Sequence, residues 1–203
     1  MTAFPKLPAD RASGSTRFFA PRRPPPEERL PRVSRRQWYG AAIHEAGHAV
    51  ACLVAGWELL EVAIGPEPCG KGQTSIGRCR PDIDHLRRPD ARGAMLFPGD
   101  YQFRRAYCRY TLAGPTAEFC LLDEPPEKPC SDDMKYAKED AETVFPGDAE
   151  YQRKFILLCG DDARLLVNEY AAEIQTVARA LLRHGRLTGA EVNALVFPKE
   201  LNR

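Results

Sequence analysis

The hydrophobic pattern predicts a mainly helical domain built around one apolar helix. Ser34 and Gln37 have the spacing of a capping box, in which each side chain satisfies a backbone donor of the other. Residues 38–57 follow and are apolar or small on nearly every side. Because a helix without a polar face belongs inside a core, we expect these residues to form the centre of the fold. Gly56 is expected to end the helix.

The rest of the chain shows the pattern of a hairpin followed by the patterns of several helices. Residues 59–64 and 73–76 predict a small β-hairpin, and residues 81–99, with three prolines, predict a loop. Apolar residues at helical spacing begin again at Asp100, although Pro115 should kink or restart that helix. Further helices are expected over residues 131–144, from about residue 161 to residue 184, and after Thr188.

Charge divides the chain into two regions. The first 36 residues contain seven prolines, nine Lys or Arg and three acids, which gives a charge of +6 and leaves −5 for the other 167. Such a segment cannot bury enough apolar surface to offset its ordering entropy. We therefore expect residues 1–35 to be a disordered Pro/Arg-rich basic arm that could bind an acidic partner. Residues 36–198 should form the domain, and residues 199–203 a C-terminal tail.

Composition excludes several classes of protein. A net charge of +1 argues against a general nucleic-acid binder. No apolar run reaches the 18 residues of a membrane span, and the N-terminus lacks the apolar segment of a secretory signal. Seven cysteines without a CxxC pair are typical of reduced thiols, so the expected location is cytoplasmic. Residues 65–72 resemble a P-loop, but Gly72 replaces its Ser or Thr, so no nucleotide binding is expected.

The candidate chemistry lies in the apolar helix. His44, Glu45 and His48 form an H-E-x-x-H motif. Side chains four residues apart share one helix face, so the two imidazoles can bind one metal ion. Glu45 points about 100° away, where it can take a proton from a metal-activated water whose pKa is lowered towards ~7. The alternative, two core histidines and a surface glutamate, would place three ionisable groups on an apolar helix without a metal to compensate them.

Spacing alone leaves the third ligand open. A metzincin would need Gly and His at positions that Ala51 and Val54 occupy, so that class is excluded. His85 lies in the expected loop, and the helix dipole explains His184. The remaining candidates are the acids Glu118, Asp132 and Asp133.

Four segments resemble the FtsH-type zinc metallopeptidase family (peptidase M41) in the family's order. They are HEAGHAV, LAGPTAE at 112–118, SDDMKYA at 131–137 and LTGAEV at 187–192. The resemblance implies a helical metallopeptidase domain with a small β element. It also implies His44, His48 and Asp133 as zinc ligands, with Glu45 as catalytic base. Glu118 would then orient a ligand imidazole.

The resemblance therefore predicts a zinc-dependent metalloendopeptidase that acts on a polypeptide substrate. The family's ATPase module is not expected here, so the chain should not be an ATPase itself, and the resemblance leaves an oligomer open. Two alternatives remain: a catalytically silent, zinc-stabilised regulatory or binding module, and a zinc hydrolase of a non-peptide amide. Iron and other ions also suit a His₂-carboxylate site.

Overall fold

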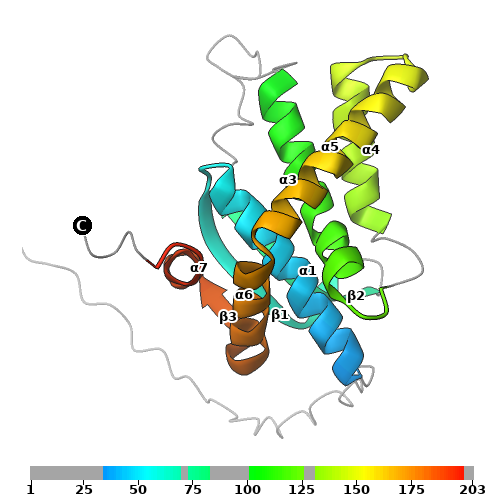
Figure 1. Cartoon of the computed structure of the whole chain (residues 1–203). Coiled ribbons are helices and arrows are strands. Elements are labelled where there is room, and N and C mark those ends of the chain that lie inside the picture. Colours follow the sequence, from blue (N-terminus) through cyan, green and yellow to red (C-terminus); the bar gives the residue numbers. More distant parts are fainter. Residues whose placement is uncertain (1–33, 70–72, 83–100, 126–130, 199–203) are drawn as a thin grey trace, which may run out of the picture. The chain divides into compact units, whose positions relative to one another are not determined.

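The computed structural model describes residues 34–69, 73–82, 101–125 and 131–198. Within these ranges the chain forms six helices and a three-stranded antiparallel sheet, so the mainly helical class with a small β element is confirmed (Figure 1). Residues 1–33 of the expected arm and the expected tail at 199–203 lie outside them. Among the described helices, none combines the length and the apolar composition that crossing a membrane requires.

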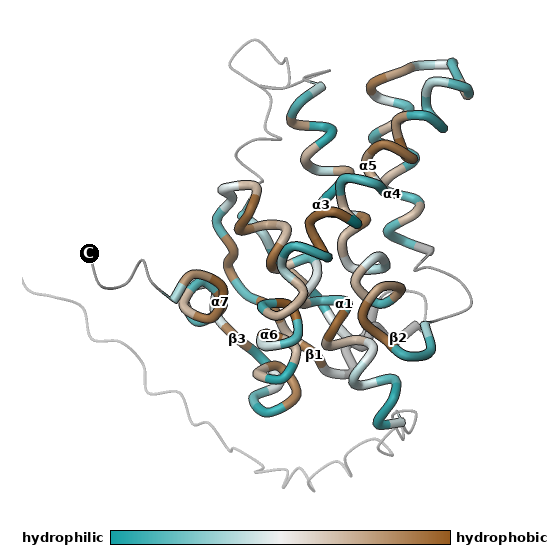
Figure 2. The backbone as a smooth tube through the Cα atoms, in the orientation of Figure 1, coloured by the Kyte–Doolittle hydropathy of each residue, from teal (hydrophilic) through white to brown (hydrophobic). Residues whose placement is uncertain are grey.

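Helix α1 (Arg35–Val54) is the buried helix that the apolar run predicts. Gln37 N–H donates to Ser34 Oγ and Ser34 N–H donates to Gln37 Oε1, which confirms the capping box. Its first turn is hydrophilic and the following turns are more apolar (Figure 2). The helix contacts the sheet, α3 and α6, and most side chains of its middle turns are buried. Gly56, with φ of +74°, follows its end.

The sheet is larger than the sequence pattern predicts. Strands β1 (Glu58–Cys69) and β2 (Gln73–Asp82) form the expected antiparallel hairpin, but β2 includes the first two residues of the expected loop. Gly77 and Pro81 are poor strand formers, so the pattern ended β2 too early. A third strand, β3 (Arg186–Thr188), pairs with the other side of β1 and gives the order β2-β1-β3. Three residues contain too little alternation to predict a strand.

Three helices form a second, smaller core beside the one around α1. They are α3 (Tyr101–Leu121), α4 (Ser131–Val144) and α5 (Ala149–Glu169). Helix α3 continues through Pro115 as a single element, so the helix does not restart there. The buried members of this core are Cys108, Leu112, Ala137, Ala141, Phe155, Cys159 and Ala163.

Ion pairs reinforce the contacts of α3. Arg104 Nη1 donates to Asp140 Oδ1 of α4 at 2.8 Å, and the Asp140 side chain is only 4% exposed. Arg105 makes a two-pronged contact with Asp162 of α5, at 2.7 and 2.9 Å. Paired guanidinium and carboxylate groups of this geometry fix orientation as well as distance. The two ion pairs, Arg104–Asp140 and Arg105–Asp162, therefore help to fix the positions of α4 and α5 along α3.

The C-terminal helices correct one prediction. The helix expected from residue 161 to residue 184 is two helices, because α5 already begins at Ala149 and a break at Tyr170 separates it from α6 (Ala171–His184). Gly160 and the following aspartates resemble a helix start, but the buried Cys159 and Ala163 hold α5 helical through them.

The end of the fold agrees with the pattern. Gly185, with φ of +72°, ends α6. Thr188 and Glu191 form a second capping box, which opens α7 (Gly189–Val196). Both α6 and α7 contribute buried side chains to the core around α1.

Two mid-helix glycines provide a matched stability test. A Cβ at Gly47 would lie 2.7 Å from the carbonyl oxygen of Ala113, whereas a Cβ at Gly160 would meet nothing within 4 Å. We expect Gly47→Ala to destabilise the fold by about 1–3 kcal/mol through overpacking. Gly160→Ala should stabilise it by up to about 1 kcal/mol. Urea denaturation measures both, and equal effects would contradict the close approach of α1 and α3.

Candidate metal centre and cleft

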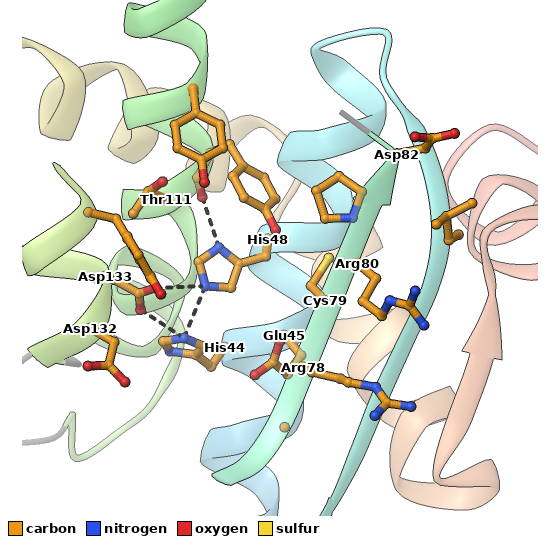
Figure 3. A pocket seen from close by; sticks show the side chains of 16 residues that line it. His44, Glu45, His48, Arg78, Cys79, Arg80, Asp82, Thr111, Asp132 and Asp133 are labelled. Atoms are coloured by element: carbon orange, nitrogen blue, oxygen red, sulfur yellow. Dashed lines mark hydrogen bonds and ion pairs between the residues drawn. The ribbon is translucent and has the colours of Figure 1, made fainter. Parts of the chain in front are cut away.

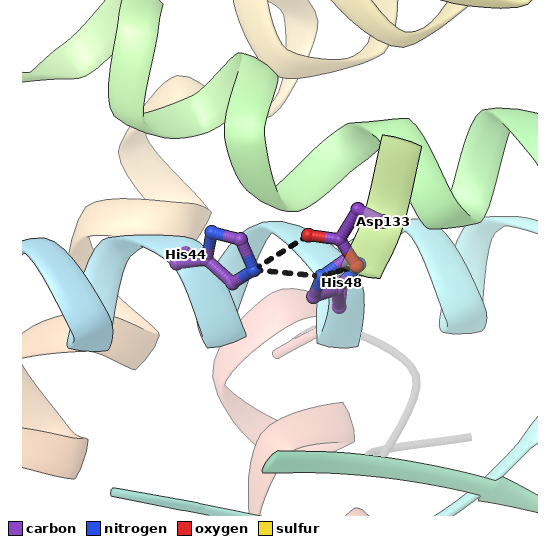
Figure 4. Close-up of side chains that lie close together, drawn as sticks. All are labelled: His44, His48 and Asp133. Atoms are coloured by element: carbon purple, nitrogen blue, oxygen red, sulfur yellow. Dashed lines mark hydrogen bonds and ion pairs between the residues drawn. The ribbon is translucent and has the colours of Figure 1, made fainter. Parts of the chain in front are cut away.

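Three side chains from two helices converge on one point. His44 and His48 project from successive turns of α1, and Asp133 projects from the first turn of α4 (Figure 4). The two Nε2 atoms lie 3.1 Å apart, and Asp133 places Oδ2 3.1 Å from His44 Nε2 and Oδ1 3.6 Å from His48 Nε2. These residues form a group that could hold a metal ion.

The spacing suits a shared ion. Ligands about 2.0–2.1 Å from one zinc ion in tetrahedral geometry lie roughly 3.3 Å from each other. The two imidazole nitrogens, 3.1 Å apart, are close to that edge length, and one oxygen of Asp133 lies 3.1 Å from His44 while the other lies 3.6 Å from His48. The side chains of His44, His48 and Asp133 are 13%, 8% and 14% exposed, so bulk water is largely kept from their donor atoms.

Hydrogen bonds at the far side of each ring determine which atoms face the centre. A carbonyl oxygen can only accept, so His48 Nδ1 must donate to Tyr110 O, 2.9 Å away. His44 Nδ1 lies 3.5 Å from Glu118 Oε1. With Nδ1 protonated, each neutral ring presents the lone pair of Nε2 to the centre.

The centre is thus an assembly of acceptors that needs a positive charge. Asp133 Oδ2 is buried 3.1 Å from His44 Nε2, and while that nitrogen carries no proton the oxygen receives no hydrogen bond from the described residues. Burial opposes protonation of His44, but hydrogen bonds to Asp133 and Glu118 outweigh it and raise the pKa of His44 well above its usual value. Burial favours the neutral form of Asp133, yet the two histidines hold its pKa below the usual range. A bound cation or an added proton would supply the positive charge that these acceptors require.

Glu45 lies in the same cleft but outside the group of three. The cleft measures about 530 Å³ and runs between β2 and the α3 and α4 side (Figure 3). Glu45 is 7% exposed, and a Cβ at Gly77 of β2 would lie 2.6 Å from its Oε1. Burial raises the pKa of Glu45, and the positive character of His48 and His44 limits the increase. A proton acceptor therefore stands between the histidines and the strand.

Four residues that shape this cleft were not predicted from the sequence. A Cβ at Gly114 would collide with the His48 ring, so only glycine lets α3 lie this close to α1. Gly77 plays the same part for Glu45. Tyr110 orients His48 through its carbonyl, and its side chain hydrogen bonds to that of Cys79. An isolated glycine in a strand signals close backbone approach, so Gly77 could have been found.

The structure brings together some of the candidate ligands and separates others. His44, His48 and Asp133 come together, and Glu118 lies against the outer nitrogen of His44, as expected of a residue that orients a ligand. Asp132 lines the cleft but does not belong to the group. His184 is in the last turn of α6, and His85 lies outside the described residues.

Comparison of the sequence with protein-family models finds no match, and comparison with curated proteins finds no significant match.

Two adjacent aspartates allow a direct test of whether Asp133, together with His44 and His48, holds a metal ion. Asp133→Ala removes an oxygen donor from the centre, and we expect the purified protein to lose most of its bound zinc. Asp132→Ala removes an exposed carboxylate of the same helix turn and should leave zinc content unchanged. Mass spectrometry of metal content after dialysis measures both, and zinc retained by Asp133→Ala would exclude this residue as a ligand.

Gly114 should control zinc affinity without contributing a ligand. The added methyl group of Gly114→Ala must displace the His48 ring. We expect zinc affinity to fall by about 10- to 100-fold, as for other changes that misorient a ligand. Gly40→Ala is the control, because its Cβ would meet neighbours only at 3.8 and 3.9 Å. Competition with a chromogenic chelator measures both affinities, and equal values would contradict the contact.

Proposed function

We propose that the chain is a zinc-dependent metalloendopeptidase related to the FtsH-type peptidases. The observation that carries the proposal is the arrangement of His44, His48 and Asp133 around one point, with the buried Glu45 beside them in an open cleft. A purely structural zinc site has no use for an additional buried carboxylate and prefers four protein ligands. Three ligands leave one coordination position open, as a catalytic site requires.

The proposed mechanism assigns one task to each side chain. The two histidines and Asp133 would hold the ion, which when bound would supply Lewis acidity to water and to a carbonyl group. Glu45 takes a proton from the attacking water. It then gives that proton to the nitrogen of the leaving amine, so the peptide bond breaks as a carboxylate and an amine form.

Strand β2 offers a way to hold the substrate. Among the described strands it is one of the two at an edge of the sheet, and Gly77, Cys79 and Pro81 line the same cleft as Glu45. An extended peptide that adds to such an edge gains backbone hydrogen bonds whatever its sequence. Because Gly77 lies against Glu45, a peptide paired with β2 would lie close to the base.

Replacement of Glu45 separates catalysis from metal binding. We expect Glu45→Gln to keep its zinc but to lose at least about 100-fold in hydrolysis, since an amide cannot act as the base. Glu139→Gln, at an exposed position of α4, should retain full activity. The substrate is a peptide library made from a digested cell lysate, with new termini counted by mass spectrometry with and without chelator. Equal cleavage by wild type and Glu45→Gln, or no zinc-dependent cleavage by wild type, would overturn the proposal.

A further inference from the structure

The outer face of the sheet, turned away from α1, carries a group of arginines around one carboxylate. In the strand register, Glu61 of β1 is opposite Arg80 of β2, while Ala63 is opposite both Arg78 of β2 and Arg186 of β3. Directly paired residues share a face, and their inner-face neighbours Val62 and Leu187 are buried. The three arginines therefore lie together on the outer face, over the small side chain of Ala63.

Three arginines share one carboxylate in this group. Glu61 Oε1 lies 2.9 Å from Arg78 and 3.2 Å from Arg80, and Oε2 lies 3.2 Å from Arg186. Partial burial alone would raise the pKa of Glu61, but the arginines lower it, so this carboxylate is ionised at neutral pH. Glu61 therefore pairs with three arginines at once, while Asp82 and the residue opposite it, Glu58, carry the other negative charges of this face.

Two of the three arginines belong to the strand that borders the cleft. Arg78 and Arg80 line the cleft as well as the outer face, and in Figure 3 they extend from β2 away from the two imidazoles. Between and beside them, Gly77 and Cys79 face Glu45 on the inner side. A peptide added to β2 would thus place alternate side chains beside the arginines and the others towards the metal group.

We propose that the cleft selects extended polypeptide segments that carry acidic side chains at two alternate positions, i and i+2, opposite Arg78 and Arg80. The inference rests on the proposed function, because it takes β2 as the strand that holds the substrate. Opposite charges directly across a strand pair attract, and like charges repel. An Asp-Xaa-Asp or Glu-Xaa-Glu segment therefore gains two contacts that a neutral or basic segment lacks.

Asp82 would fix the position along β2 at which the acidic pair binds. It follows Arg80 by two residues on β2 and lines the same cleft. Alternation puts it on the face that carries Arg78 and Arg80, so the strand presents two positive charges and then one negative charge. A basic residue two positions beyond the acidic pair, on the side of Asp82, should complete the complementary pattern.

The first experiment compares peptides that differ only in charge. The set consists of eight-residue fluorescent peptides with Glu-Xaa-Glu, Gln-Xaa-Gln or Lys-Xaa-Lys at the same positions. Binding to the full chain carrying Glu45→Gln, loaded with zinc, is followed by fluorescence polarisation. We expect the Glu pair to bind about three- to tenfold more tightly than the Gln pair, and the Lys pair more weakly than either. The preference should shrink as salt is added.

The second experiment uses two arginines that touch the same carboxylate. Arg80→Gln removes a positive charge from the edge strand, and we expect most of the preference for the Glu pair over the Gln pair to disappear. Arg186→Gln removes an equal charge, also 3.2 Å from Glu61, but from β3 on the far side of β1. It should leave the ratio unchanged. Thermal melts of both variants verify that they are folded.

The outcomes separate the two proposals. Equal binding of the Glu and Gln peptides, no binding of any peptide, or the same ratio in Arg80→Gln as in wild type would overturn the acidic preference. Those results leave metal-dependent hydrolysis of the peptide library as a separate measurement. Conversely, a chain that prefers the Glu pair but hydrolyses nothing would support the inference on β2 and overturn the peptidase.

Discussion

The convergence of three electron-pair donors on one small volume is the constraint on which the rest of the structure depends. Two neutral imidazole nitrogens and a carboxylate repel one another unless a positive charge lies among them. The fold maintains this arrangement by fixing both ends of each ring: Tyr110 and Glu118 hold the outer nitrogens, and Asp133 faces the inner ones. The energetic cost of bringing these groups together is offset when a bound cation or an added proton lies among them.

Close packing of α1 against α3 makes that geometry attainable. Gly47 lets the backbones approach, with Ala113 and Ala117 filling the space on α3. Gly114 leaves room for the His48 ring next to the helix that orients it. The absence of a side chain thus does as much to build the centre as the presence of the ligands. On the opposite side Gly77 brings β2 against Glu45 in the same way.

Local patterns in the sequence predicted local structure well. Both the capping box at Ser34 and the helix over residues 131–144 follow from short-range spacing, and so does the common helix face of His44 and His48. The partner of the histidines could not be derived in this way, because Asp133 reaches them only through the packing of α4 on α3. The resemblance to a family indicated it instead. The break at Tyr170 and the strand β3 were missed for a related reason, since tertiary contacts decide both.

The two cores of the domain meet at the metal group. The histidines stand on a helix of the larger core, whereas Asp133 stands on α4, whose buried side chains belong to the smaller one. An ion bound by all three residues would therefore link the larger core to the smaller one. Binding it would hold α4 more firmly against α1, so occupancy of the site would also stiffen one wall of the cleft.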